Sequence, residues 1–513
     1  MIRIALSLFM TTFTSLCFSQ VSILGTNRTE IQHGNLPSGT KGDQLNFYER
    51  LDMNSRYHAF DADFRVEMFE SQRRNTSYIH LAQRSLSWKS SGWAMQAGNF
   101  YTTLGRGLLL RAYELPGVIF EQRQFRRRYS YYRDIDGAIL RYNGKRLETQ
   151  LFWGSVLDNT FPPDLEGIDR RPNEITGGQF RLHTGLGLKA GMAAMQQKHV
   201  SGSEEMFHTL MAEWSLRSWL RKWGLKSTHI AFYAEHAQAG PSWESHFTHN
   251  KTGHATVASV TVVYKTLGLS AEFKDYDQFE NRINLPPILY REHSQYLLNR
   301  VTHELLADAE QGVQVELNWR PTLDLFLVAN LSHAQNDFSY RSFEFFDRFL
   351  ELNWQGHEKL SLKLFFDHSK DEVRGDQSRL TTGMETEWQF IYPYALTLDI
   401  QNQSLKTGFI PSRTTSHINR YIALSLSASP IFTFSLAFDH SNNPVDVDDP
   451  LTPSRLETGA KTWVHGTASI RLKSAHQLDL FYGERRGGLI CLSGTCFEVL
   501  PFKGLEFRYV VNF

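Results

Sequence analysis

The sequence predicts an all-β fold: a large transmembrane antiparallel up-and-down β-barrel of about 24 strands, within roughly 22 to 26. Three observations lead to this fold class. Apolar and polar residues alternate along many segments of about ten residues, and short turn motifs separate these segments in pairs. In addition, no long stretch has the helical period of about 3.6 residues.

The composition excludes one class of partner. The 513 residues include 54 basic and 54 acidic side chains, so the formal net charge is zero. A neutral chain creates no overall field that would favour nucleic acid. Beyond the N-terminal segment, no apolar run is long enough for a membrane helix. Strands that cross a bilayer escape this test, because lipid-facing residues alternate with polar ones.

The N-terminus has the pattern of a secretory signal peptide. Arg3 precedes an apolar run over 4–18, and Ser19-Gln20 follows it. An uncleaved anchor helix is the alternative, but the run has roughly 15 residues, whereas a membrane span needs about 20. We therefore expect a signal peptide at 1–19, export through the general secretion pathway, and a mature barrel at 20–513.

The expected strands follow one another from about Val21 to Phe513. Clear alternation occurs at 61–68, 313–319, 323–332, 360–367, 384–390 and 432–439. Short polar turns are expected at 90–92, 143–145, 184–185, 265–268, 320–322, 355–358, 392–393, 429–430 and 473–475, where Gly, Asn and Pro supply tight backbone angles. Longer polar loops are expected at about 105–135, 158–173, 237–253, 278–305, 439–460 and 483–502. Short turns at one end and long loops at the other are typical of transmembrane barrels.

The loop at about 105–135 is the main candidate functional segment. It contains a run of Leu108, Leu109 and Leu110, which would be costly in water, so we expect part of the loop to pack inside the barrel. Arginine binds anionic groups bidentately and aromatic rings stack on sugars. One interpretation is a constriction that contacts a small anionic or sugar solute; the other is an ion-paired loop that braces the wall or binds lipopolysaccharide. The candidate residues are Arg106, Arg111, Arg123, Arg126, Arg127, Arg128, Tyr131 and Arg133.

Cys491 and Cys496 lie in the last long loop, and an exported chain meets an oxidising compartment. We expect a disulfide that shapes the tip of an outward-facing loop; a metal pair is the alternative, but no histidine lies beside these cysteines.

Other chemistry has little support in the sequence. The 20 histidines are scattered without a closely spaced ligand set, so we expect no metal or cofactor. Asp446, Asp448 and Asp449 lack the spacing of a calcium loop, which favours a solvated surface over a calcium site. No motif marks a nucleophile, so we expect no enzyme activity.

The C-terminal strand resembles the closing strand of bacterial outer-membrane barrels. Leu505, Phe507, Tyr509, Val511 and Phe513 alternate with mostly polar residues, and the chain ends on an aromatic ring. The resemblance implies that Tyr509, Val511 and Phe513 form an assembly signal read by the barrel-assembly machinery. It also implies a location in the outer membrane of a Gram-negative cell, in contact with outer-membrane lipid and lipopolysaccharide.

Two further stretches resemble an uncharacterised, porin-like family of exported Bacteroidetes proteins. They are 97–101 with 105–114, which includes the leucine run, and 482–496 with 501–505, which includes both cysteines. The resemblance implies the barrel but no activity. Two functions remain open. The first is a pore or selective channel for small solutes, constricted by the arginine and aromatic loop. The second is a non-transporting scaffold for a surface or secretion complex, with another envelope protein as its partner.

Overall fold

The computed structural model describes residues 21–513 except 36–42, 73–75, 123–125, 157–172, 200–201, 241–252, 280, 282, 285, 287–289, 304–308, 339–340, 411–412, 444–459 and 494. The expected signal peptide, the candidate residue Arg123 and the acidic residues Asp446, Asp448 and Asp449 lie outside the described residues.

One antiparallel sheet of 24 strands forms the wall. Its strands are β1 (Val21–Asn35), β2 (Asp43–Tyr57), β3 (Phe60–Ser71), β4 (Tyr78–Ser90), β5 (Trp93–Phe100), β10 (Ile135–Asn143), β11 (Leu147–Val156), β12 (Asn173–His183), β13 (Leu188–Lys198), β14 (Glu204–Ser215), β15 (Thr228–Gly240), β16 (Gly253–Tyr264), β17 (Leu267–Asp277), β18 (Ala309–Trp319), β19 (Leu325–Phe338), β20 (Arg341–His357), β21 (Leu360–Asp371), β22 (Asp376–Ile391), β23 (Tyr394–Thr407), β24 (Thr415–Ala428), β25 (Phe432–Ser441), β26 (Lys461–Leu472), β27 (His476–Arg485) and β30 (Phe502–Asn512).

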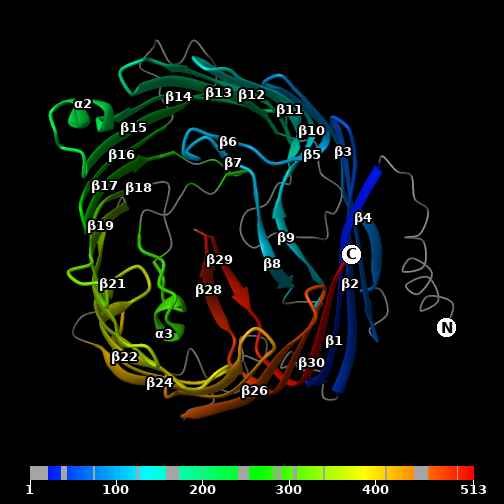
Figure 1. The fold of residues 1–513 in the computed structure, drawn as a ribbon, viewed down its shortest axis with the longest axis vertical. Helices are drawn as coiled ribbons and strands as arrows, with labels where there is room; N and C mark the ends of the chain where they lie inside the picture. Colours follow the sequence, from blue (N-terminus) through cyan, green and yellow to red (C-terminus); the bar gives the residue numbers. More distant parts are fainter. Residues whose placement is uncertain are drawn as a thin grey trace.

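The sheet closes on itself as a barrel (Figure 1). Each wall strand pairs with the next in the chain, β5 pairs with β10, and the first strand pairs with the last from Thr26↔Asn512 to Asn35↔Lys503. At the seam, the backbone N–H of Gly25 donates to the carbonyl oxygen of Phe513 at 2.8 Å. Closure leaves no free sheet edge, and it confirms the predicted fold class and strand number.

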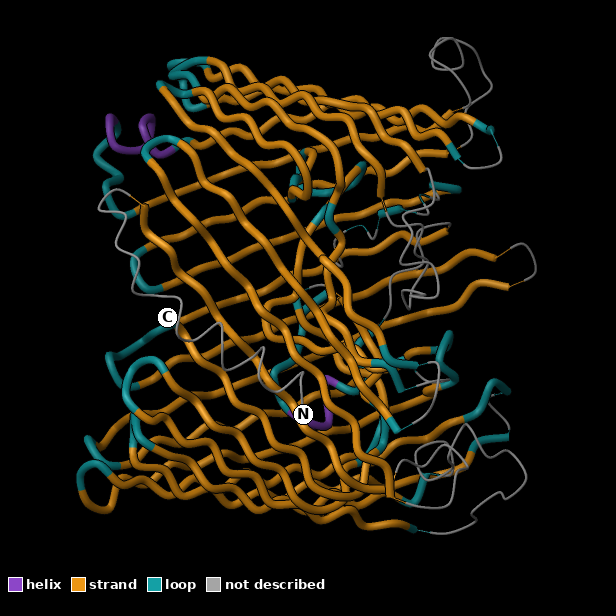
Figure 2. Tube along the Cα trace, turned by 90° about the vertical axis from the view of Figure 1, so that its right-hand side faces the viewer, coloured by secondary structure: helices purple, strands orange, loops and turns teal. Residues whose placement is uncertain are grey.

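The two ends of the barrel differ as expected (Figure 2). Short turns join the strands at one end, and the predicted turns at 90–92, 265–268 and 473–475 lie between β4 and β5, β16 and β17, and β26 and β27. Ser91 and Gly92 both have positive φ, 46° and 88°, which is the backbone that a tight hairpin between twisted strands requires. One connection at this end was not predicted as helical: α2 (Arg217–Lys222) lies between β14 and β15.

The outer face of the wall is apolar and the inner face is mainly polar. On β3, Phe60 and Phe64 are exposed on the outside, whereas Arg65 and Glu67 point inward and are buried. Exposed aromatic residues gather beside the short turns, as at a membrane interface. They include Trp88, Trp93, Trp214, Trp319, Trp388 and Tyr394. Within the described part of the chain, no helix has the length and apolar character needed to cross a membrane.

The filled part of the interior lies toward the long-loop end. On β21, the inward residues Asp367, Ser369 and Asp371 near that end are fully buried. Ser361 and Lys363 share their face but lie near the short turns, and they are only half-buried. Solvent therefore reaches the inner wall from the short-turn end, while other parts of the chain cover it toward the long-loop end.

Candidate functional site

Three long connections fold into the barrel and form a loop assembly (Figure 1). The first, 101–134, contains β6 (Thr103–Leu104), β7 (Leu110–Arg111), β8 (Tyr113–Glu121) and β9 (Arg128–Arg133). The second, 278–308, contains α3 (Tyr296–Asn299). The third, 486–501, contains the hairpin of β28 (Gly488–Leu492) and β29 (Thr495–Val499).

The leucine run of the first connection is buried, as its cost in water predicts. Leu108 and Leu109 have no exposed surface, and they belong to a core cluster that includes Phe152 and Phe207 of the wall. Asn284 of the second connection donates from Nδ2 to the carbonyl oxygens of Gly107 and Leu108, both at 2.8 Å. Apolar packing and these amide bonds fix the run inside the barrel.

The tip of the first connection lies against the inner face of the wall at β12 and β15. The backbone N–H of Gly105 donates to Gln179 Oε1 at 2.7 Å, and that of Arg106 donates to Glu235 Oε2 at 2.9 Å. Gly105 has φ of 59°, and a Cβ there would lie 2.1 Å from Glu235 Oε1, so only glycine fits this approach. The wall therefore binds the backbone of the tip and leaves the Arg106 side chain free to extend.

Arg106 is the exposed arginine of this tip. Its guanidinium lies 3.7 Å from the ring centroid of Tyr233 and donates to Ser259 Oγ at 2.8 Å. A cation held over an aromatic face beside solvent is able to contact a passing anion.

Arg126 and Arg128 lie instead in buried ion pairs. Arg126 is 1% exposed, pairs with Glu121 at 2.9 Å and donates to the carbonyl oxygen of Pro501 at 2.9 Å. Arg128 pairs with Glu30 at 2.9 Å and with Glu506 at 2.7 Å. Burial lowers the pKa of Arg126 more than the Glu121 carboxylate raises it. This geometry favours the bracing interpretation for these two arginines.

The remaining described candidates bond to other connections or to their own. Arg111 is half-buried and donates to Thr495 Oγ1 at 3.1 Å, while Arg127 donates to the carbonyl oxygen of Thr76 at 3.2 Å. Arg133 donates to the hydroxyl of Tyr131 at 3.3 Å, and Tyr131 packs on Phe497 in a buried cluster. Of the described candidates, Arg106 is thus the one whose side chain is exposed.

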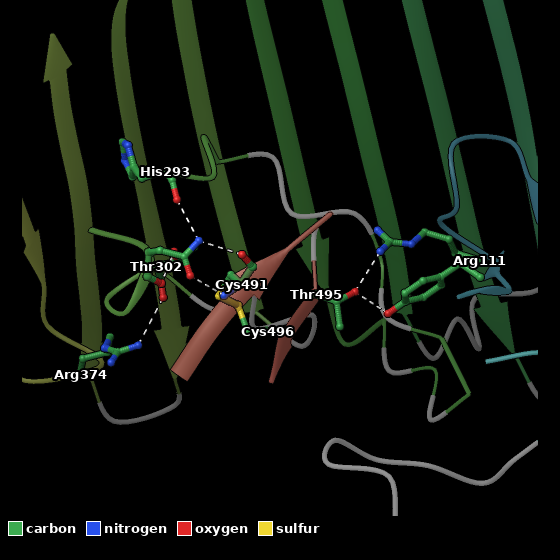
Figure 3. Close-up of a disulfide and its surroundings, with 9 residues drawn as sticks. Arg111, His293, Thr302, Arg374, Cys491, Thr495 and Cys496 are labelled. Atoms are coloured by element: carbon green, nitrogen blue, oxygen red, sulfur yellow. Dashed lines mark hydrogen bonds between the residues drawn. A yellow bond between two sulfur atoms is a disulfide. The ribbon is translucent and has the colours of Figure 1, made fainter. Parts of the chain in front are cut away.

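A disulfide joins Cys491 and Cys496 across β28 and β29 (Figure 3). The side chain of Asn299 accepts from the N–H of Cys491 at 2.9 Å and donates to its carbonyl oxygen at 2.8 Å. Both cysteines are buried, at 2% and 8% exposed. The expected outward-facing tip is therefore wrong: the hairpin folds inward because the second connection supplies its hydrogen-bonding partners.

Ionisable side chains of the second connection also contact carboxylates of the wall. His303 lies 2.8 Å from Asp371 and 3.5 Å from Glu310. Burial alone would lower the pKa of His303, but its hydrogen bonds to these carboxylates raise it overall. Tyr290 donates to Glu310 at 2.6 Å, and burial followed by the Glu310 charge raises the pKa of Tyr290.

A second group, which sequence reasoning missed, contains His293, Asp347 and Asp367. His293 Nε2 lies 3.2 Å from Asp347, and one ligand atom from each of the three residues lies within 4.8 Å of the others. Burial lowers the pKa of His293 to about 4, so its imidazole is neutral. We expected no metal ligand set because the histidines are scattered; here the fold brings together residues that are 54 and 20 positions apart.

A cavity of about 580 Å³, lined by both polar and apolar side chains, lies between β1–β5 and the first connection. Arg65 there forms an ion pair with Glu114 at 3.0 Å, so charges of both signs meet at its wall. Its polar lining includes Asp52, Asn54, Gln83, Asn99, Tyr101 and Glu114. Carboxylates, amides and a phenol offer hydrogen bonds that suit hydroxyl-rich or charged small molecules.

Several solved structures are similar to this chain at low sequence identity. Pseudomonas aeruginosa OccK5 (OpdH) shares 10% identity, with 72% of this chain and 97% of that chain covered and a TM-score of 0.42. The translocation pore of the P pilus usher PapC shares 10% identity, with 96% and 99% covered and a TM-score of 0.49. Acinetobacter baumannii OccAB2 shares 8% identity, with 69% and 92% covered and a TM-score of 0.40.

No curated protein matches the chain. A family match covers nearly all of it, from the first wall strand to the last residue. Residues 31–513 match DUF6029, a family of unknown function, and the chain belongs to that family.

Proposed function

We propose that this protein is an outer-membrane channel for small solutes, and that the loop assembly narrows its lumen. A closed wall with an apolar outside, an aromatic border and a polar inside suits a bilayer and a water-filled interior. Such a barrel lies in the outer membrane of a Gram-negative cell, in contact with lipid and lipopolysaccharide, and reaches it by export and the barrel-assembly machinery.

The position of the first connection inside the barrel carries the proposal. Gln179 and Glu235 hold the tip by its backbone, so the tip is a fixed constriction, and the exposed Arg106 lines the passage beside it. The cavity between the first connection and β1–β5 offers a place where a solute could bind. Arg106 favours small anions, whereas the amides and carboxylates of the cavity suit sugars.

A scaffold remains the second candidate, because the three connections also bond to one another. Asn299 joins the second to the third, Arg111 joins the first to the third, and Asn284 joins the second to the first. A filled lumen of this kind would suit a barrel that serves another envelope protein and carries no solute.

Single-channel recording in a planar bilayer separates the two functions. Phe100 and Ile135 are register partners on β5 and β10, so 101–134 can be replaced by a two-residue hairpin turn without moving either strand. Arg485 and Phe502 allow the same replacement of 486–501. The channel proposal predicts small conductance for the wild type and a larger one for either shortened barrel.

Heat-modifiable migration on gels must first show that each shortened barrel assembles. A wild-type protein that conducts nothing, together with assembled variants that also stay silent, would overturn the channel proposal and favour the scaffold.

A further inference from the structure

His293, Asp347 and Asp367 form a compact group where the second connection meets the wall. Asp347 lies on β20 and Asp367 on β21, and they are diagonal neighbours because Asp347 is opposite Ser369 and Asp367 is opposite Phe349. Both therefore point to the same inner face. His293, on the second connection, contacts Asp347 through Nε2. In Figure 3 its ring points away from the disulfide. The three residues are 6%, 5% and 0% exposed.

Polar atoms of this group lack hydrogen-bonding partners within the described residues. They are Nδ1 of His293, Oδ1 of Asp347 and Oδ2 of Asp367. Leaving a buried polar atom unsatisfied costs about 1–3 kcal/mol, and more for a charged group. A site with three such atoms, one from each neighbouring side chain, therefore lacks a component that would satisfy them.

Neighbouring cations are already engaged. Arg379 on β22 acts electrostatically on His293 and Asp367, but its guanidinium forms an ion pair with Asp376 at 3.0 Å. Arg291 also faces His293, and it forms an ion pair with Glu316 at 2.6 Å. Ser369 donates to Asp367 at 3.3 Å, which satisfies only one of the carboxylate oxygens. Two close carboxylates thus remain without a dedicated cation.

We propose that His293, Asp347 and Asp367 bind a divalent transition-metal ion of the Zn²⁺ class. One imidazole nitrogen with two carboxylate oxygens is a ligand set that Zn²⁺ accepts, with water completing the coordination. Calcium and magnesium prefer oxygen ligands alone, so the histidine argues against them. Ligand atoms within 4.8 Å of one another reach a shared ion, at bonds of about 2.0–2.2 Å, by small side-chain rotations.

The ion would fasten the second connection to the wall. Gln295, two residues after His293, donates to Glu351 at 2.6 Å, so this segment already follows β20. A metal bond to His293 would hold the same segment to both β20 and β21. This role does not depend on whether the barrel conducts solutes.

The test uses the full-length, detergent-folded barrel after dialysis against a chelator. Zn²⁺ is added back, and the metal retained after desalting is measured by atomic emission; Co²⁺ is used in parallel for its visible absorption. We expect one tightly held ion per barrel. Asp367→Asn and His293→Gln should each weaken binding by at least tenfold. Asp371→Asn is the matched control on the same strand, since Asp371 bonds to His303, and it should keep the ion.

X-ray absorption of the wild-type Zn²⁺ complex decides the matter even if a variant fails to assemble. The proposal requires one imidazole nitrogen with oxygen ligands. No retained ion, more than one imidazole on it, or equal retention by Asp367→Asn and the wild type would each overturn the site.

Discussion

The guanidinium of Arg128 lies 2.7 Å from the carboxylate of Glu506, which joins the first connection to the last wall strand. The same guanidinium lies 2.9 Å from Glu30 on the first wall strand. Strands β1 and β30 pair with each other where the barrel closes, so one inserted arginine bonds to both sides of the closing seam. The loop assembly therefore contributes to the stability of the wall.

Arg128→Met should destabilise the assembled barrel by about 3 kcal/mol, because it leaves the buried Glu30 carboxylate and the half-buried Glu506 carboxylate with fewer partners. Arg508 and Arg485 still neutralise Glu30 and Glu506 in part, which keeps the loss near the low end for a broken buried pair. Urea unfolding in detergent, followed by the heat-modifiable band, measures the loss. Arg106→Gln is the control and should change stability little; equal stability of the two variants would contradict the bracing role.

Arg106→Glu should lower the anion preference of the proposed channel. Its backbone N–H still donates to Glu235, so the tip stays in place while the charge beside the passage is reversed. We expect the permeability ratio of chloride to potassium to fall by roughly twofold at low salt, with a smaller change at high salt because of screening. Reversal potentials in a salt gradient give this ratio. Arg126→Gln, which changes an arginine in a buried ion pair, is the comparison. A larger change in the permeability ratio for Arg126→Gln than for Arg106→Glu would refute the position of Arg106 beside the passage.

His303 should make the barrel more stable at acidic pH than at alkaline pH. Its pKa is raised in the folded protein by Asp371 and Glu310, so its contribution is full below the unfolded value of about 6.5 and is lost as pH rises through the folded pKa. His303→Gln should therefore lose more stability at pH about 5.5 than at pH about 9. Thermal unfolding at both pH values tests this, with His440→Gln, a half-buried histidine on β25, as control; a loss of stability that does not depend on pH would contradict it.

Much of the fold could be predicted from sequence because a barrel wall is periodic. The alternation at 360–367 identifies both faces of β21, and Ser90, Ser91 and Gly92 predict a turn from local backbone chemistry alone. Neither inference needs knowledge of distant residues. The sequence did not predict helix α2, because its six residues are too few to show a helical period.

The candidate site was less predictable because it depends on contacts between distant segments. Arg106 and Arg128 are both arginines of the first connection, and the sequence does not distinguish them. In the structure Arg106 is exposed beside Tyr233, whereas Arg128 is buried between Glu30 and Glu506. Only the path of the first connection distinguishes them. The inward direction of the disulfide hairpin likewise depends on Asn299, which lies 192 residues before Cys491.

Cys491 and Cys496 should resist a thiol-labelling reagent in protein isolated without reductant. Because only five positions separate them, the disulfide closes a small loop and should add little global stability. The double variant Cys491→Ser with Cys496→Ser should therefore assemble normally while 486–501 exchanges amide hydrogens faster. Mass spectrometry reads both effects. Ready labelling of the wild type would show that the bridge is absent.

Phe513→Asp should lower the amount of assembled barrel in the outer membrane. The backbone of Phe513 exchanges hydrogen bonds with Gly25 at 2.8 and 2.9 Å, and its ring is 41% exposed on the outer face at the closing seam. A charged side chain there faces lipid and also removes the last aromatic of the proposed assembly signal, Tyr509, Val511 and Phe513. Phe513→Tyr keeps an aromatic ring and is the matched control. Membrane fractionation with heat-modifiable migration gives the assembled amount, and wild-type levels of Phe513→Asp would count against both the signal and the seam.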